Sequence, residues 1–241
     1  METTEQKGQG RFTQISLFSV LLAGRYGGVC SIADVKKHGN LAIATMDRLD
    51  GEMQMIDGVV YQACADGRVL LPKDDETIPF GTIAMFTPEQ ELRLDAIPCF
   101  EVFEERMKTE CPGLNLPLAV HLKGDFRHVK VRAVARQEKD GIGLAEAARN
   151  EAVFEFEDIP GDMVGFRLPD YVQGINAPGW HLHFVDDARR HGGHVVNFSL
   201  KQGLMRICHA CDFRIMLPEV LNELDLDRDW TDDLRKAEAE R

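Results

Sequence analysis

The chain has 241 residues, with 28 basic and 40 acidic side chains and a formal net charge of −12 at pH 7. Hydrophobic residues make up 44% and charged residues 28%, values that are typical of a globular protein and disfavour a disordered chain, a collagen and a coiled-coil rod. A nucleic-acid groove is disfavoured too, because binding a phosphate backbone needs a basic patch and no dense lysine–arginine cluster occurs.

The sequence predicts neither a secretory signal nor a membrane span. Its first residues are polar, and the longest apolar stretch, residues 17–23, is far shorter than the ~20 residues that a membrane helix needs. The six cysteines are scattered, so we expect reduced thiols and a cytoplasmic location. Only Cys208 and Cys211 have metal-ligand spacing. In a strand these two side chains would point to opposite faces, and we expect them to be structural.

The N-terminal half changes from a helical to an extended pattern near residue 40. We expect a loose polar tail at residues 1–12, a buried helix over 16–26, and a short helix that Ser31 caps and that stops at Gly39. Strand-like runs separated by Asp-Gly pairs, which favour hairpins, follow at 41–45, 52–56, 59–63 and 68–71. This half is therefore predicted to contain an antiparallel meander, followed by a helix over 100–110.

The C-terminal half is rich in strand patterns. Gly124 and Asp125 predict a hairpin turn between strands at 118–123 and 126–136. Further strands are expected at 152–156, 163–168, 180–185, 194–201 and 204–217. The final acidic segment, residues 219–240, is expected to be helical or loose.

These elements predict an α+β protein of two lobes. Residues 15–115 would form an N-terminal sheet with helices, after a polar tail at 1–14. Residues 116–218 would form a lobe whose sheet is closed or nearly closed into a barrel, and residues 219–241 would follow it as an acidic segment.

Three histidines form the most informative motif. His181 and His183 alternate with aromatic and aliphatic residues, so both imidazoles share one face of a strand. His194 follows a charged, glycine-rich loop, and a hairpin there would return it close to His183. Three imidazoles are a typical ligand set for a catalytic divalent metal, zinc above all, with positions left open for water or substrate. A histidine pair in a strand also fits ordinary surface or core residues, and the third histidine favours the metal site.

Longer motifs resemble one known family. His181-x-His183, ten intervening residues and then Gly192-Gly193-His194 resemble the zinc motif of α-acetolactate decarboxylases. The stretch over residues 165–179 and the run Leu49-Asp50-Gly51-Glu52, followed by Asp57-Gly58-x-x-Tyr61-Gln62, are also similar to that family's signature. The similarity runs in order from about residue 15 to the C-terminus.

The resemblance implies a fold and an activity. The family's fold has two lobes, a mixed sheet that can extend across a homodimer and a β-barrel-like lobe that bears the metal. Its members convert 2-acetolactate to (R)-acetoin and carbon dioxide with zinc and without thiamine diphosphate, the metal acting as an electron sink for an enediolate.

The resemblance also implies roles for individual residues. His181, His183 and His194 match the metal ligands. Glu52 matches a glutamate near the metal, and Arg132 matches the active-site arginine; without the resemblance, both would be interpreted as surface charges. A C-terminal glutamate that folds back to the metal matches Glu238, with Glu240 as a competing assignment. The chain departs from the family pattern at Asn197, where an aspartate is common, and at Ala177 and Trp180.

Two other functions compete with this hypothesis. A cupin-like oxygenase also uses three histidines, but it usually has a glutamate shortly after the pair, and none occurs between His183 and His194. A non-catalytic module that binds a metal or a small molecule would have no need for Glu52 and Arg132 at the metal.

Overall fold

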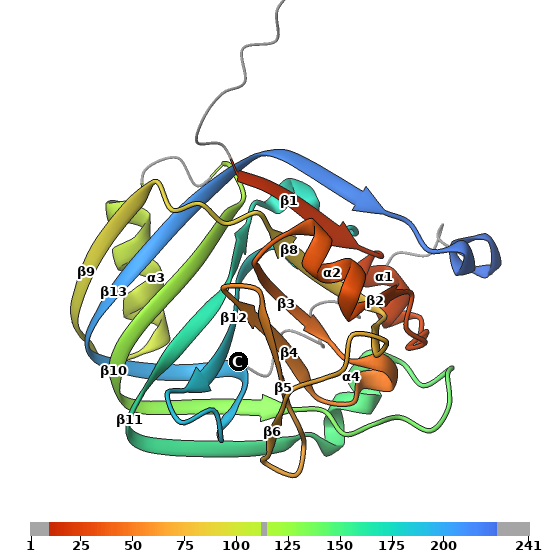
Figure 1. The fold of residues 1–241 in the computed structure, drawn as a ribbon, viewed down its shortest axis with the longest axis horizontal. Coiled ribbons are helices and arrows are strands. Elements are labelled where there is room, and N and C mark those ends of the chain that lie inside the picture. Colours follow the sequence, from red (N-terminus) through yellow and green to blue (C-terminus); the bar gives the residue numbers. More distant parts are fainter. Residues whose placement is uncertain (1–9, 112–114, 226–241) are drawn as a thin grey trace, which may run out of the picture.

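One mixed sheet of 11 strands contains most of the chain. The computed structural model describes residues 10–111 and 115–225. Along the sheet the strands follow the order β10-β11-β12-β13-β1-β8-β3-β4-β5-β6, and β9 pairs with β13 off this path. A separate two-stranded sheet joins β2 to β7. The α+β class is thereby confirmed. Because β1 links β13 to β8, the barrel-like and meander regions are parts of one continuous sheet (Figure 1).

The first part of the chain forms short elements. They are β1 (Gly10–Ile15), α1 (Phe18–Leu22), β2 (Cys30–Ser31), α2 (Ile32–His38), β3 (Leu41–Thr45), a 3₁₀ turn (Asp47–Leu49), β4 (Glu52–Ile56), β5 (Val59–Ala63), β6 (Val69–Leu70), β7 (Thr77–Ile78), β8 (Phe80–Ala84), β9 (Gln90–Ile97) and α3 (Phe100–Glu110). The predicted meander, α3 and the capped α2 are confirmed, and the backbone N–H of Asp34 donates to the hydroxyl of Ser31 over 3.1 Å. None of the described helices is long and apolar enough to cross a membrane.

The prediction of a loose tail through residue 12 was wrong at its end. Residues Gly10–Ile15 form β1, which pairs in parallel with β13 and antiparallel to β8. Phe12 is fully buried there and packs edge-on against Phe166 of β11, with ring centroids 5.2 Å apart. The segment looks polar in sequence because it contains Gln14. This side chain is nevertheless buried, and its carboxamide oxygen accepts a hydrogen bond from Thr82 over 2.9 Å.

The second part of the chain forms four long or strongly curved strands. They are β10 (Leu118–Ala133), β11 (Ala152–Leu168), β12 (Gly179–Asp186) and β13 (Gly192–Met216), with α4 (Leu144–Ala147) and 3₁₀ turns at Ala148–Asn150, Asp170–Val172 and Glu219–Glu223 beside them. β10 pairs with both β11 and β13, and β12 pairs with both β11 and β13. Figure 1 shows these strands curving around α3, whose Phe103 and Met107 are buried in the core that they enclose.

The hairpin predicted at Gly124 and Asp125 was wrong, because β10 runs through it without a turn. Gly124 lies opposite Gly161 of β11 on one side and opposite Gly203 of β13 on the other. A Cβ at Gly161 would lie 2.6 Å from the carbonyl oxygen of Val185, and one at Gly124 would lie 2.8 Å from that of Gln202. The glycines are therefore a row of close backbone approaches across three strands, which is a typical role of glycine where strands bend.

We expect Gly161→Ala to destabilise the fold. Its methyl group would overlap Val185 and the ring of Phe184, and such overpacking costs about 1–3 kcal/mol. For a chain of this size, each kcal/mol lowers the Tm by about 2–4 °C. Gly27→Ala is the matched control, since its Cβ would meet nothing within 4 Å. Equal Tm values for the two variants, measured by thermal unfolding, would contradict the role given to the glycine row.

Candidate active site

A cavity of about 90 Å³ lies between the meander and the long strands. Its titratable lining residues come from elements far apart in sequence: Glu52 on β4, Arg132 on β10, Glu151 before β11, His181 and His183 on β12, and His194 on β13. Most of the remaining lining is apolar and includes Phe18, Leu21, Leu49, Phe80, Val134 and Leu144. Charged and polar groups therefore meet in a space largely enclosed by hydrocarbon side chains.

The three imidazoles converge as the strand pattern predicted. His183 lies directly opposite His194 in the pairing of β12 with β13, and His181 shares the face of His183. Nε2 of His181 lies 3.3 Å from Nε2 of His183 and 3.0 Å from Nδ1 of His194. All three ligand atoms lie within 4.8 Å of one another.

His183 is fixed by the backbone of the meander. Its Nδ1 lies 3.0 Å from the carbonyl oxygen of Met53, and because a carbonyl only accepts, Nδ1 carries the proton and Nε2 presents its lone pair. Burial lowers the pKa of His183 to about 3; the charge of Arg132 adds to this effect and the hydrogen bond to Met53 opposes it. His183 is therefore a neutral imidazole at neutral pH, which is the form that binds metals.

These features fit a metal ion. Two nitrogens bonded to one tetrahedral zinc at about 2.0–2.1 Å lie about 3.3–3.4 Å apart, close to the spacings around His181. The donor set also suits other first-row metals, so it does not select zinc alone.

Glu52 stands beside the imidazoles. Its Oε2 lies 3.6 Å from Nε2 of His183, and only 12% of its side chain is exposed. Gly51 turns the chain into β4 with a φ of +83°, and a Cβ there would lie 2.3 Å from the carbonyl oxygen of Ala63. Burial, assisted by the charge of Glu151, raises the pKa of Glu52 to about 7; Arg132 and the backbone N–H of Val134 act in the opposite direction.

Arg132 is buried and adjoins the histidines. It lies opposite His194 in the pairing of β10 with β13, and 8% of the residue is exposed. Its Nη1 forms an ion pair with Glu151 at 3.3 Å. Sequence reasoning missed Glu151, because it follows a polar loop and no motif surrounds it. The structure thus brings together Glu52, Arg132 and the three histidines, while Glu238 and Glu240 lie outside the described residues.

Two of the departures from the family pattern, Asn197 and Trp180, contact α3. The side-chain oxygen of Asn197 accepts hydrogen bonds from the backbone N–H groups of Phe100, over 3.0 Å, and Phe198, over 2.8 Å. Asn197 thereby holds the start of α3, a task that an aspartate would also perform. Trp180 packs against Phe103 of the same helix. Cys208 is buried whereas Cys211 is exposed, in agreement with the expectation that they do not act as a pair.

Imidazoles, carboxylates and a guanidinium around one largely apolar cavity define an enzyme site suited to a small anionic molecule. The family model for α-acetolactate decarboxylase matches residues 12–226. Over 227 residues the chain is 38% identical to the α-acetolactate decarboxylase of Methanosarcina mazei, covering 93% of this chain and 79% of that protein. It is 36% identical over 205 residues to that of Bacillus licheniformis, covering 85% and 81%.

A crystal structure confirms the match in three dimensions. That of the α-acetolactate decarboxylase from Bacillus subtilis strain 168 superposes with a TM-score of 0.91 at 32% identity, covering 95% of this chain and 99% of that one. The chain belongs to the α-acetolactate decarboxylase family and is an enzyme of the carboxy-lyase class.

We expect His183→Ala to lose metal binding. The variant removes the nitrogen that Met53 orients, and zinc affinity should fall at least about 100-fold, beyond the 10–100-fold that losing an outer-shell partner costs. Metal content after zinc loading and desalting measures it, with His128→Ala on the outer part of β10 as the control. One zinc per chain retained in His183→Ala would contradict the ligand set.

Proposed function

We propose that this enzyme decarboxylates 2-acetolactate to (R)-acetoin and carbon dioxide, using one divalent metal, zinc, held by His181, His183 and His194. The observation that carries the proposal is the convergence of three imidazole nitrogens within 4.8 Å in the cavity that also holds Arg132 and Glu52. Membership of the family supports the choice of substrate. We further propose a cytoplasmic homodimer that needs no thiamine diphosphate.

The chemistry requires a place for negative charge. Breaking the bond to the carboxylate leaves an electron pair, which spreads onto the neighbouring carbonyl oxygen and gives an enediolate. The carbon that carried the carboxylate then takes up a proton, which comes ultimately from solvent, and acetoin results. A divalent cation supplies Lewis acidity for that charge without a redox change. The apolar walls of the cavity keep the effective dielectric constant low, which strengthens every charge interaction inside it.

Arg132 is proposed to bind the substrate's carboxylate. Its planar guanidinium matches a carboxylate in shape. Orientation of the substrate is therefore the role we assign to it. Its place opposite His194 in the ladder sets the bound carboxylate beside the imidazoles.

Glu52 is proposed to hold or accept the proton of the substrate's hydroxyl group. It projects into the cavity next to His183, within reach of a molecule that contacts both. Because burial brings its pKa near 7, both its protonated and its ionised form are accessible at neutral pH, as general acid–base catalysis requires.

The direct test is incubation of zinc-loaded enzyme with racemic acetolactate. Acetoin and carbon dioxide should form in equal amounts, should fall to the spontaneous rate after EDTA treatment and should return when zinc is added back. Acetoin is measured by chromatography. Formation no faster than in buffer alone would overturn the proposed function. Full activity after verified metal removal would overturn the metal dependence alone.

The C-terminal segment is proposed to fold back as a lid, with Glu238, or Glu240 in the competing assignment, reaching the metal. Deleting residues 231–241 should then lower kcat strongly, by about 100-fold or more if the ligand closes the site, and leave the Tm almost unchanged. Glu238→Gln and Glu240→Gln, assayed separately, identify the carboxylate. Unchanged turnover after the deletion would refute the lid.

Two other functions receive less support. A cupin-like oxygenase does not agree with the family to which the chain belongs. A non-catalytic module would not require a buried guanidinium and a carboxylate only 12% exposed beside the three histidines.

A further inference from the structure

Glu151 and Arg132 form an enclosed ion pair in the wall of the active site. Both oxygens of Glu151 face Nη1 of Arg132, at 3.3 and 3.4 Å. The two side chains are only 11% and 10% exposed, and both line the cavity. A buried guanidinium is costly without an opposite charge, so this carboxylate helps to keep Arg132 inside the protein.

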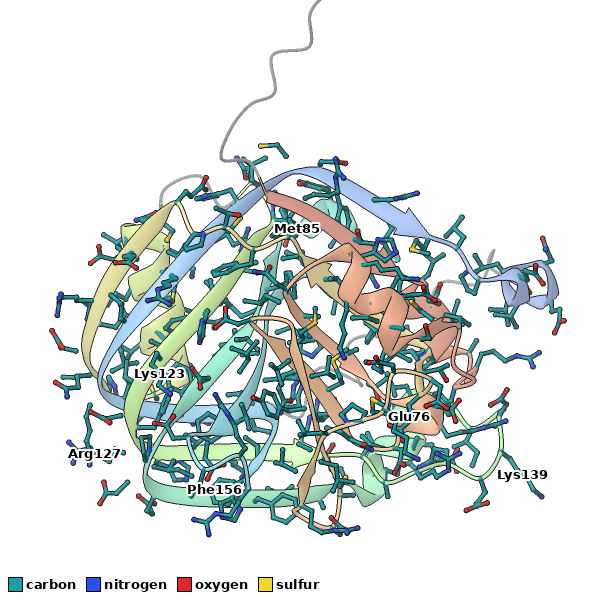
Figure 2. The ribbon with its side chains drawn as sticks, viewed as in Figure 1. Glu76, Met85, Lys123, Arg127, Lys139 and Phe156 are labelled. Carbon is teal, nitrogen blue, oxygen red and sulfur yellow. The ribbon has the colours of Figure 1, made fainter. Side chains whose placement is uncertain are left out.

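The chain that carries Glu151 is anchored at several points. Residues 134–151 connect β10 to β11, and Figure 2 shows Lys139 projecting outward from this connection. Asp140 forms an ion pair with Arg48 at 2.7 Å. The hydroxyl of Tyr26 donates to the carbonyl oxygen of Ile142 over 2.5 Å. These contacts tie the connection to the segment that follows α1 and to the 3₁₀ turn Asp47–Leu49 between β3 and β4.

The anchored connection then leads directly into the cavity wall. Leu144 and Ala148 line the cavity, and Glu151 follows the 3₁₀ turn Ala148–Asn150 as the last residue before β11. Arg132 approaches from the other end of the same connection, one residue before β10 ends at Ala133. The backbone therefore holds both partners of the ion pair, and the carboxylate of Glu151 has a defined place from which to act on the guanidinium.

We propose that Glu151 is a positioning residue, whose carboxylate holds the guanidinium of Arg132 in the orientation that binds the substrate's carboxylate. The inference rests on the proposed function. Arginine has a long side chain with high rotamer entropy, and its planar group recognises a carboxylate only in a defined orientation. With Nη1 held by Glu151 at one end and Nε bonded to the side chain at the other, the guanidinium has fewer orientations open to it.

The expected kinetic signature is a weaker Michaelis complex. The substrate's carboxylate is fully charged in the ground state and loses its charge as carbon dioxide departs. Loss of guanidinium orientation should therefore appear mainly in KM and less in kcat. A general loss of folding would instead lower the amount of active enzyme and leave KM unchanged.

The first experiment compares Glu151→Ala with the control Glu155→Ala, a substitution of an exposed glutamate further along β11. For Glu151→Ala, we expect KM for acetolactate to rise roughly 10- to 100-fold. The inhibition constant for 2-hydroxy-2-methylpropanoate, which has the carboxylate and hydroxyl but no ketone, should rise in parallel. Glu151→Asp should recover part of the loss, and zinc content should stay at one per chain. Unchanged KM and inhibition constant in Glu151→Ala would overturn the inference.

The second experiment is a double-mutant cycle with Arg132→Lys. If Glu151 acts through Arg132, adding Glu151→Ala to Arg132→Lys should cost much less than it costs the wild type. Independent, multiplying losses would overturn the positioning role. The wild-type assay separates the two proposals, because its failure removes the proposed function, whereas an active wild type with independent losses removes only the role of Glu151.

Discussion

The hydrogen bond from Nδ1 of His183 to the carbonyl oxygen of Met53 joins the two regions that make the active site. In this hydrogen bond Nδ1 of His183 donates its proton to the backbone of β4, which leaves the unprotonated Nε2 facing His181. The same contact holds β4 against β12, and Glu52, the neighbour of Met53, reaches within 3.6 Å of the imidazole. The three imidazoles on the long strands and a carboxylate on the meander are thus positioned by one contact. Arg132 joins them through its pairing opposite His194.

The positive charge of Arg132 in the site is opposite in sign to the net charge of the whole molecule. The formal net charge of −12 repels an anionic substrate, so capture must depend on local cations. Arg132 supplies such a charge. Part of the electric field of its guanidinium ends on the neighbouring carboxylate of Glu151 in the cavity wall. Burial lowers the pKa of His183, which is therefore neutral at neutral pH, and raises the pKa of Glu52 to about 7. The enclosed apolar walls make these few groups more influential than the many acidic residues on the surface.

The elements that depend on contacts between residues close in sequence were predicted correctly. The strands from Leu41 to Ala63 and the helix Phe100–Glu110 have the expected bounds, because short hydrophobic runs and Asp-Gly turns specify them directly. The turn predicted at Gly124 was wrong. Glycine is common in turns, but here it allows the backbones of β10, β11 and β13 to approach closely. The histidines were identifiable from their spacing. Glu151 was not, because only the folded connection brings it to Arg132.

The pairing of β1 with β13 places Gly10 opposite Ala210. Closing a loop of that length costs conformational entropy before any new contact offsets it, whereas β3, β4 and β5 pair through short turns. The structure therefore implies an order of assembly, in which the meander forms early and the cavity forms late. Until β1 arrives, β8 presents an unpaired edge to solvent. A chain delayed at that stage carries a strand edge open to other chains, which makes the slow, long-range pairing a point of competition between folding and aggregation.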